Sequence, residues 1–265
     1  MLIVLLAVVG LSLGSFINAL VWRIHEHKDW IRGRSECINC QHNLAPLDLV
    51  PLVSWLLLRG KCRYCHKNIS LQYPVVELLT PLLFILFYLF WPVGLSSVNQ
   101  WVVFGGWLMM LVGLVALAVY DLRWMILPNG LMIYLTFLAV TITAINLLTA
   151  GFNWYGLLDT ILGALIGGGL FYILFQVSSG KWIGGGDVKL GFVLGLLAGS
   201  AQRSFLMIFL AALAGCLVSI PFLMLGKLSK KSTIPFGPFL IIGLLIVQLA
   251  GTVILNWYGR TFLGI

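Results

Sequence analysis

The chain has 265 residues, of which 61% are hydrophobic and only 9% are charged, and its formal net charge is +8. Soluble domains carry about a quarter charged residues, so this composition excludes a typical soluble protein and indicates an integral membrane protein. Backbone polar groups that cross lipid must be satisfied within helices or closed barrels. The apolar runs are continuous and do not alternate as barrel strands do. The predicted fold class is therefore an all-α polytopic membrane protein.

About eight membrane-spanning helices are predicted, because each span needs roughly 20 apolar residues. In chain order they lie near Leu2–Trp22, Pro74–Trp91, Trp101–Tyr120, Pro128–Leu148, Tyr155–Val177, Val188–Gly199, Phe205–Leu225 and Phe236–Trp257. The sixth is short and is either buried among the others or crosses a thinned bilayer. The first has no basic residue before its apolar run, which favours a retained helix over a cleaved signal. The chain thus divides into a first helix (1–22), a loop (23–73) and a helical bundle (74–265).

The basic residues predict the orientation of these spans. Threading eight spans places fourteen of the sixteen Lys and Arg residues on one side, eight of them in the loop 23–73. Because positive residues mark the cytoplasmic face, the loop is predicted inside the cell and both termini outside. This topology explains the net charge, so nucleic-acid binding is not needed to account for it.

Two C-x-x-C pairs, "CINC" and "CRYC", lie in the loop and are separated by 21 residues. Their members are Cys37, Cys40, Cys62 and Cys65. Four thiolates at such spacing suit one tetrahedral zinc ion that stabilises a loop and does not activate water. The cytoplasmic side disfavours disulfides, although two redox pairs or unrelated thiols remain alternatives. His42 and His66 flank the pairs; His66 could replace a thiolate, but exposure is expected for both. Cys216 lies within a span, where we expect it to pack.

Two carboxylates reach the predicted cytoplasmic boundary from distant parts of the chain. Asp121 closes the third span and Asp187 opens the sixth. Each has a plain structural explanation, because Asp187 could be a helix N-cap and Asp121 could pair with Arg123. Together they suit acid–base chemistry, since of two adjacent carboxylates one keeps a proton while the other activates water. Glu77 and Asp159 also lie near spans; Glu77 could favour a helix start or shape the site, and Asp159 is expected to be solvated.

Three glycines, Gly184, Gly185 and Gly186, precede the second carboxylate. Glycine permits φ values closed to other residues, and its lack of a side chain could leave backbone groups free to pair with an extended substrate. Glycine stripes elsewhere, such as Gly10–Gly14, Gly163–Gly167 and Gly191–Gly195–Gly199, are expected to serve close helix packing. No repeat of 20–50 residues is evident.

Five motifs in order resemble the bacterial type IV prepilin peptidases, membrane aspartic proteases of the G-x-G-D class. They are "GSFINALVWRI", the stretch from "CINC" to "VVELLT", "YDLRWMILPNGL", "GGGDVKL" and "PFGPFLIIG". The resemblance implies cleavage of the basic leader of prepilins and pseudopilins at the cytoplasmic face of the bacterial inner membrane, followed in many members by N-methylation with S-adenosylmethionine. By matching positions it implies that Asp121 and Asp187 are catalytic and that the four loop cysteines bind zinc. Asn129 departs from the aspartate found there in many relatives.

Two other classes of function compete with an enzyme. Inward-facing carboxylates and broken helices also occur in transporters, and a scaffold could use the zinc-stapled loop to hold other membrane proteins. No inverted repeat is visible, which disfavours the transporter, and a scaffold would not need both aspartates.

Overall fold

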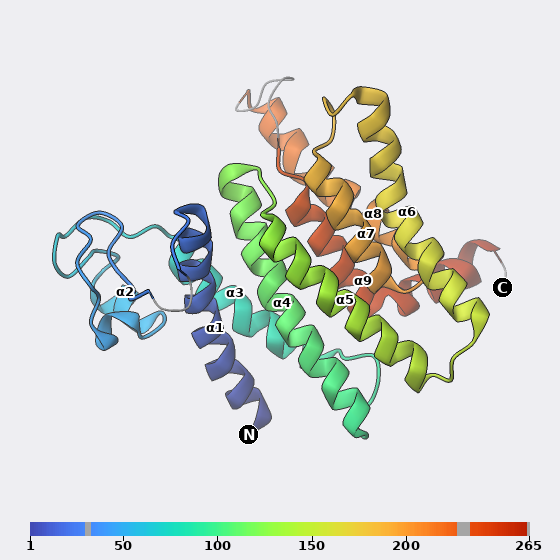
Figure 1. The fold of residues 1–265 in the computed structure, drawn as a ribbon, viewed down its shortest axis with the longest axis horizontal. Helices are drawn as coiled ribbons and strands as arrows, with labels where there is room; N and C mark the ends of the chain where they lie inside the picture. The colour runs from blue at the N-terminus through green and yellow to red at the C-terminus, as the bar shows by residue number, and fades with distance from the viewer. Residues whose placement is uncertain (30–32, 227–233, 264–265) are drawn as a thin grey trace. The chain divides into compact units, whose positions relative to one another are not determined.

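The computed structural model describes residues 1–29, 33–226 and 234–263, and within them the chain is helical (Figure 1). The elements are α1 (Leu2–His25), η1 (Pro46–Leu49), α2 (Val53–Leu57), α3 (Gln72–Leu89), α4 (Val98–Trp124), α5 (Asn129–Thr149), α6 (Trp154–Ser178), α7 (Gly185–Ala198), α8 (Ala201–Met224), α9 (Gly237–Tyr258) and η2 (Gly259–Leu263). The described residues contain only two isolated β-bridges, so the all-α prediction is confirmed. Four basic residues behind the predicted orientation, Arg32, Lys227, Lys230 and Lys231, lie outside the described residues.

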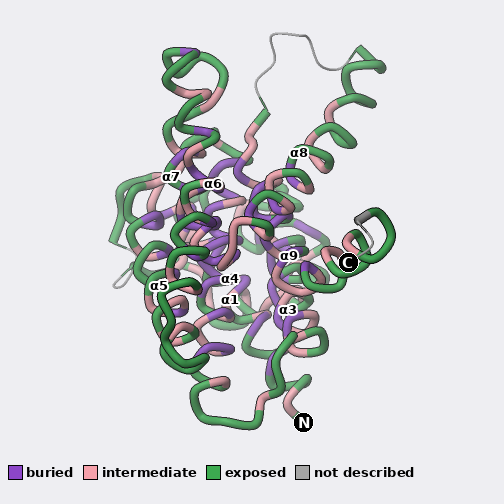
Figure 2. Tube along the Cα trace, turned by 90° about the vertical axis from the view of Figure 1, so that its right-hand side faces the viewer, coloured by how far each residue is buried: buried purple, intermediate pink, exposed green. Residues whose placement is uncertain are grey.

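Within the described ranges, seven helices are long and apolar enough to cross a membrane, namely α1, α3, α4, α5, α6, α8 and the α9–η2 segment Gly237–Phe262. They correspond to seven of the eight predicted spans. The remaining one is α7, which has 14 residues and is therefore about 21 Å long, shorter than a hydrocarbon core of about 30 Å. Much of the trace of α5, α6 and α8 is exposed (Figure 2), as expected for helices whose outer faces meet lipid.

One compact unit comprises residues 1–91 and the middle of α4, residues 111–119. In it α1 and α3 pack with almost no side chain between them. A Cβ atom added at Gly10 would lie 2.5 Å from the Cα atom of Pro81, and one at Gly14 would lie 2.8 Å from that of Glu77. The expectation that Gly10 and Gly14 serve packing is confirmed.

A buried polar residue fastens α1 to the start of α3. The Nδ2 of Asn18 donates to the carbonyl of Tyr73 at 3.2 Å, and its Oδ1 accepts a hydrogen bond from Gln72 at 3.1 Å. Deeper in α3, the buried Glu77 accepts a hydrogen bond from the backbone N–H of Leu52 at 2.8 Å. Glu77 therefore anchors the loop to the helices of its own unit.

The second unit comprises residues 92–110 and 120–265. Its core is the antiparallel pair α6 and α7, which meet along glycines. A Cβ atom at Gly195 would lie 2.5 Å from the carbonyl oxygen of Gly163, and one at Gly167 would lie 2.6 Å from that of Gly191. These glycines serve close packing, as predicted, and they fix the position of α7 along the axis of α6.

The far end of α7 is closed by a capped turn into α8. Gly199 ends α7 with φ +79°, a left-handed conformation that glycine adopts without strain. The Thr160 hydroxyl donates to the Gly199 carbonyl at 3.3 Å, and the Asp159 carboxylate accepts from the N–H of Ala201 at 3.0 Å. Asp159 is exposed, as expected, but it also caps the first turn of α8, a role that its position in the sequence does not indicate.

Candidate active site and metal centre

Asp121 lies in the last turn of α4, where the chain leaves the helix. The helix ends at Trp124, and Met125 adopts a left-handed conformation with φ 53° whose N–H donates to the Asp121 carbonyl at 2.8 Å. The Asp121 side chain is buried, with 5% of the residue exposed. Arg123 is exposed and lies over the Trp124 ring at 5.6 Å. Among the described residues no ion pair joins Arg123 to Asp121. The suggestion that Asp121 serves to pair with Arg123 is therefore wrong.

Asp187 occupies the first turn of α7 but is not its N-cap. The N-cap is Gly184, and Asp187 is the third residue of the helix. Its backbone N–H donates to the carbonyl of Gly184 at 3.1 Å, while the N–H of Gly184 donates back to the Asp187 carboxylate. This reciprocal pairing resembles half of a capping box, and it fixes the direction in which the carboxylate points.

The two carboxylates are close enough for the charge of Asp187 to act on Asp121. A third element, the start of α9, lies against Asp121. The backbone N–H of Gly237 interacts with the Asp121 carboxylate, and a Cβ atom at position 237 would lie 2.6 Å from its Oδ2 atom. This Oδ2 atom is buried and has no hydrogen-bond partner in the described structure. An unpaired buried carboxylate oxygen beside a second carboxylate can bind a water molecule or share a proton.

The three glycines do not have the conformation that the sequence suggested. None of them has positive φ: Gly184 has φ −72° and ψ 144°, and Gly185 and Gly186 begin α7. The explanation by special φ values is therefore wrong. Space is the constraint at Gly186, because a Cβ atom there would lie 3.0 Å from the side chain of Leu127. Gly186 thus lets α7 approach the turn that follows Asp121.

A polar contact joins α7 to α5 beside the carboxylates. The Lys189 ammonium donates to the Oδ1 atom of Asn129 at 3.1 Å. Asn129 is the position that departs from the family pattern, and it remains able to accept this hydrogen bond. Gly237, Leu127 and this pair were not assigned a role from the sequence; the glycine–proline step at the start of the last helix is the signal that could have indicated Gly237.

The four loop cysteines form one cluster in the other unit, and their sulfur atoms lie within 4.8 Å of one another. Cys37 Sγ and Cys65 Sγ are 3.9 Å apart, close to the edge of about 3.8 Å of a tetrahedron with Zn–S bonds of about 2.3 Å. Burial opposes ionisation of Cys37, but hydrogen bonds from the N–H groups of Cys40 and Asn39 lower the pKa of its thiol to about 7. The donor set and its spacing fit a metal ion with four thiolate ligands.

The two cysteine pairs are copies of one backbone motif. Cys37 N–H donates to the His42 carbonyl and Gln41 N–H to the Cys37 carbonyl; the equivalent bonds, 25 positions later, run from Cys62 to Lys67 and from His66 to Cys62. Gln41 and His66 share a left-handed conformation, with φ 56° and 57°. The expectation that no repeat exists at this spacing is wrong for the loop, where "CINCQHN" and "CRYCHKN" align residue by residue.

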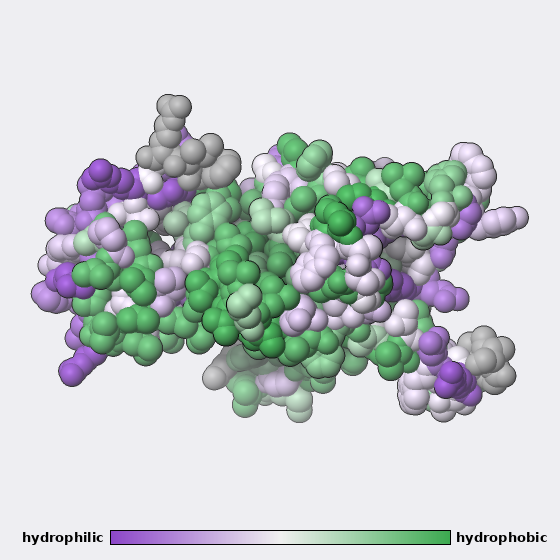
Figure 3. Space-filling view, turned by 90° about the horizontal axis from the view of Figure 1, so that it is seen from below, coloured by the Kyte–Doolittle hydropathy of each residue, from purple (hydrophilic) through white to green (hydrophobic). Residues whose placement is uncertain are grey.

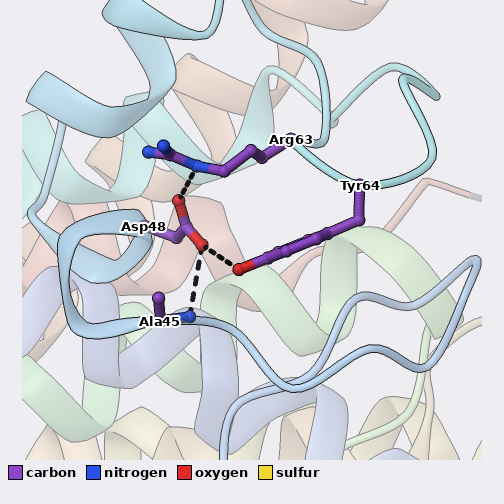
Figure 4. A network of polar contacts seen from close by, with 4 residues as sticks. All are labelled: Ala45, Asp48, Arg63 and Tyr64. Carbon is purple, nitrogen blue, oxygen red and sulfur yellow. Dashed lines mark hydrogen bonds and ion pairs between the residues drawn. The ribbon is translucent and has the colours of Figure 1, made fainter.

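The buried carboxylate of Asp48 joins the segment between the two cysteine motifs to the second motif (Figure 4). Asp48 accepts hydrogen bonds from Arg63 at 2.7 Å, from the Tyr64 hydroxyl at 3.1 Å and from the Ala45 N–H at 3.2 Å. Burial would raise the pKa of Asp48, but these hydrogen bonds outweigh burial and lower it. His42 stacks on Tyr64 with ring centroids 3.8 Å apart, and both His42 and His66 are exposed, as expected. Cys216 is exposed on α8, so the prediction that it packs is wrong.

Comparison with known proteins identifies the family. The bacterial peptidase A24 N-terminal domain matches residues 8–91, and the type IV leader peptidase family matches residues 108–220. The chain is 33% identical to a prepilin leader peptidase/N-methyltransferase of Bacillus subtilis, over 98% of this chain and 99% of the relative. It is also 33% identical to one of Aeromonas hydrophila (96% and 92% covered) and 31% identical to one of Pseudomonas aeruginosa (94% and 90% covered).

No solved structure matches the chain. The relatives are named as enzymes, which gives no support to the transporter and scaffold alternatives. With similarity that spans nearly the whole of both proteins, the chain belongs to the type IV leader peptidase family.

Proposed function

We propose that this protein cleaves the leader peptide of prepilins or pseudopilins in the membrane, with Asp121 and Asp187 as its catalytic pair. The observation that carries the assignment is that the two carboxylates, 66 positions apart in sequence, come from helix ends that meet. The start of α7 lies against the turn that follows Asp121, with a Cβ position at Gly186 3.0 Å from Leu127, and one buried oxygen of Asp121 lacks a partner. Family membership supports the reaction class, and the geometry supports the choice of residues.

The pair hydrolyses the peptide bond through a water molecule. One carboxylate is ionised and takes a proton from water as it attacks the carbonyl carbon, while the other is protonated and donates a hydrogen bond to the carbonyl oxygen. The tetrahedral intermediate collapses when the C–N bond breaks and a proton passes to the leaving amine. The two groups titrate as a unit. The Gly237 N–H and the Gly184 N–H hold Asp121 and Asp187, respectively, in position.

The substrate reaches this pair as an extended backbone. The N–H groups of Gly185 and Gly186 lie in the first turn of α7, where they have no partner within the helix. We expect them to bind carbonyl groups of the substrate close to Asp187. Gly184, Gly185 and Gly186 are therefore proposed as substrate-binding residues through their backbone, since none carries a side chain.

The protein is a multi-pass protein of the inner membrane, with seven apolar helices among its described residues. The distribution of its basic residues supports a cytoplasmic location for the loop and for the carboxylates. Its macromolecular partners are then prepilin-like substrates whose leaders lie on the cytoplasmic side, and the lipid bilayer itself.

Zinc is the metal proposed for the cysteine cluster, because four thiolates in a closed tetrahedral set favour it. When bound, zinc supplies cross-links within the loop and leaves no open position for water. Cys37, Cys40, Cys62 and Cys65 would hold it. The hydrogen bonds to Cys37 prepare one thiolate for binding.

N-methylation of the newly exposed amine is proposed as a second activity, with S-adenosylmethionine as the methyl donor. The names of the relatives support it. No residue of this chain is assigned to methyl transfer.

Incubation of the purified protein with a prepilin, followed by mass spectrometry, tests both activities. A mass loss equal to the leader is expected without added cofactor, and a further methyl group is expected when S-adenosylmethionine is present. An unchanged prepilin mass under conditions in which the protein is folded would overturn the peptidase assignment.

A further inference from the structure

Large apolar side chains are exposed on the segment between the two cysteine motifs. The exposed fraction is 73% at Leu47 on η1 and reaches 65% at Leu56 and 78% at Leu57 on α2. The surface, called here the η1–α2 surface, consists of Leu47, Leu49, Val50, Val53, Leu56 and Leu57. A gathered apolar patch of this kind marks a site of interaction with a protein or a membrane. We propose that the η1–α2 surface docks into the cytoplasmic leaflet of the bilayer that α1 and α3 cross.

The orientation of this surface is fixed by contacts on the other side of the segment. The ring of Trp55 packs against Gly60, where a Cβ atom would lie 3.0 Å from the indole. The Glu77 carboxylate holds the N–H of Leu52, the residue that precedes α2, and Asp48 holds η1 to Arg63 and Tyr64. The leucines are therefore presented outward by a rigid support, and their exposure does not come from a loosely attached loop.

Two views of the loop and the first helix bear on the direction in which the surface faces. In Figure 1 the first helix descends from its junction with the loop toward its N-terminus, which lies below the loop. Figure 3 shows the same molecule from below, and on the loop at its left end apolar side chains gather inside a hydrophilic margin. Loop and helix belong to one compact unit. These views fit an η1–α2 surface that faces the side on which α1 enters the hydrocarbon.

Basic residues that closely follow the η1–α2 surface in the chain suit an anionic lipid surface. Arg59, Lys61 and Lys67 are exposed, and in the described parts of the chain none of them forms an ion pair, whereas Arg63 and Lys28 are paired with Asp48 and Glu36. A basic residue close to an anionic leaflet strengthens binding by a factor of about five. Apolar insertion with a basic rim is the pattern of a segment that lies in the membrane interface.

Lipid crosslinking tests the proposal on the full-length protein in nanodiscs, without substrate. A photoreactive amino acid is placed at Leu57, and the same residue at Asn39, exposed in the first cysteine motif, serves as the control. We expect lipid adducts by mass spectrometry at position 57 and not at 39, with a yield that rises when phosphatidylglycerol is added to phosphatidylcholine. Adducts at position 57 that join only protein segments, or a lipid yield no higher than at position 39, would overturn it.

A second arm separates docking from loop folding. The photoreactive residue is placed at Val53 and combined with Leu56→Gln and Leu57→Gln. The lipid yield at position 53 is expected to fall severalfold while bound metal stays constant, because the cysteine cluster does not involve these leucines. Undiminished lipid yield in the double variant counts against the proposal. The inference rests on the cytoplasmic location proposed for the loop but does not use the catalytic assignment. Because crosslinking needs no turnover, docking and catalysis can fail separately.

Discussion

Gly237 lies so close to Asp121 that a Cβ atom at position 237 would be 2.6 Å from the carboxylate oxygen Oδ2. The first residue of α9 thus defines the space in which the carboxylate sits. Since the clashing atom ends a side chain that can rotate, Gly237→Ala should leave the fold intact and displace the carboxylate. Misplacement of a catalytic group by about 1 Å lowers activity by about 10²-fold, and a loss of that order in prepilin cleavage by the purified variant is expected.

Gly169→Ala provides the matched control, because no atom lies within 4 Å of the Cβ position at this glycine of α6. It should cleave prepilin at the rate of the unchanged protein. Full activity in Gly237→Ala would show that the approach of α9 does not position Asp121.

Asp121→Asn and Asp187→Asn should each lower the rate of cleavage strongly while the protein stays folded. Asparagine keeps the shape of the side chain but can neither accept a proton from water nor share one with its partner. Removal of acid–base catalysis lowers rates by about 10²- to 10⁴-fold. Leader removal is followed by mass spectrometry, and methylation of a pilin that has already been cut reports folding. Cleavage by either purified variant at a rate near normal would exclude the pair.

Gly186→Ala should slow cleavage by about tenfold. The start of α7 should shift by less than the roughly 1 Å that lowers activity by about 10²-fold. A Cβ atom there meets the Leu127 side chain at 3.0 Å, whereas one at Gly185 meets Phe175 at 3.7 Å, an ordinary contact. Gly185→Ala should therefore be milder.

Combining Gly186→Ala with Leu127→Ala tells the two roles of Gly186 apart. If the glycine is required for helix packing, removing the Leu127 side chain should restore most of the cleavage rate. If it is required because the substrate lies against it, the double variant should stay as slow as Gly186→Ala.

Cys62→Ser should lose the bound metal, because Cys62 is the buried member of the four-sulfur cluster. Three thiolates no longer close a tetrahedral zinc shell. Elemental analysis of purified protein should find one zinc ion per chain before the change and little after it. Cys216→Ser, which alters an exposed cysteine of α8, should keep full metal content. Absence of zinc from the unchanged protein would refute the assignment of the metal.

Asp48→Asn should lower the free energy of unfolding of the loop by roughly 1 kcal/mol. The expected effect is small because the Arg63 side chain is half-exposed. Zinc release to a chelator at neutral pH should then be about fivefold faster. The lowered pKa of Asp48 sets the pH range of its contribution, which is complete above the usual pKa of an aspartate and is lost only as the pH falls through the lowered value. Release rates of the two proteins should converge below that range and differ by a constant factor at neutral pH.

Composition and apolar run length were sufficient to predict the helices, because lipid imposes one solution on the backbone. Seven of the predicted spans appear at nearly the expected residues. The length of α7 did not allow its place to be predicted, since a segment of 14 residues can cross, lie flat or stay buried. The glycine contacts between α7 and α6 determine where α7 lies, and such contacts depend on the partner helix.

The candidate site residues could be singled out from the sequence, because a carboxylate in an apolar helix and four spaced cysteines are unusual. The residues that position them could not be identified from the sequence. Gly237 approaches Asp121 only because the start of α9 reaches the end of α4, and Leu127 limits Gly186 only because the turn after α4 meets the start of α7. The φ explanation for the glycines failed for the same reason: sequence shows that a side chain is missing, but only the surrounding atoms show what occupies its place.

The close seam between α6 and α7 has a consequence for how the enzyme measures its substrate. Backbones in direct contact at Gly163 and Gly195 cannot slide past one another by a fraction of a residue, as helices separated by flexible side chains can. The position of Asp187 along the bundle is therefore fixed by α6, a helix that supplies neither carboxylate of the proposed pair. If Asp187 is catalytic as proposed, the choice of which substrate bond is cut would depend on a helix that contributes no group to the reaction.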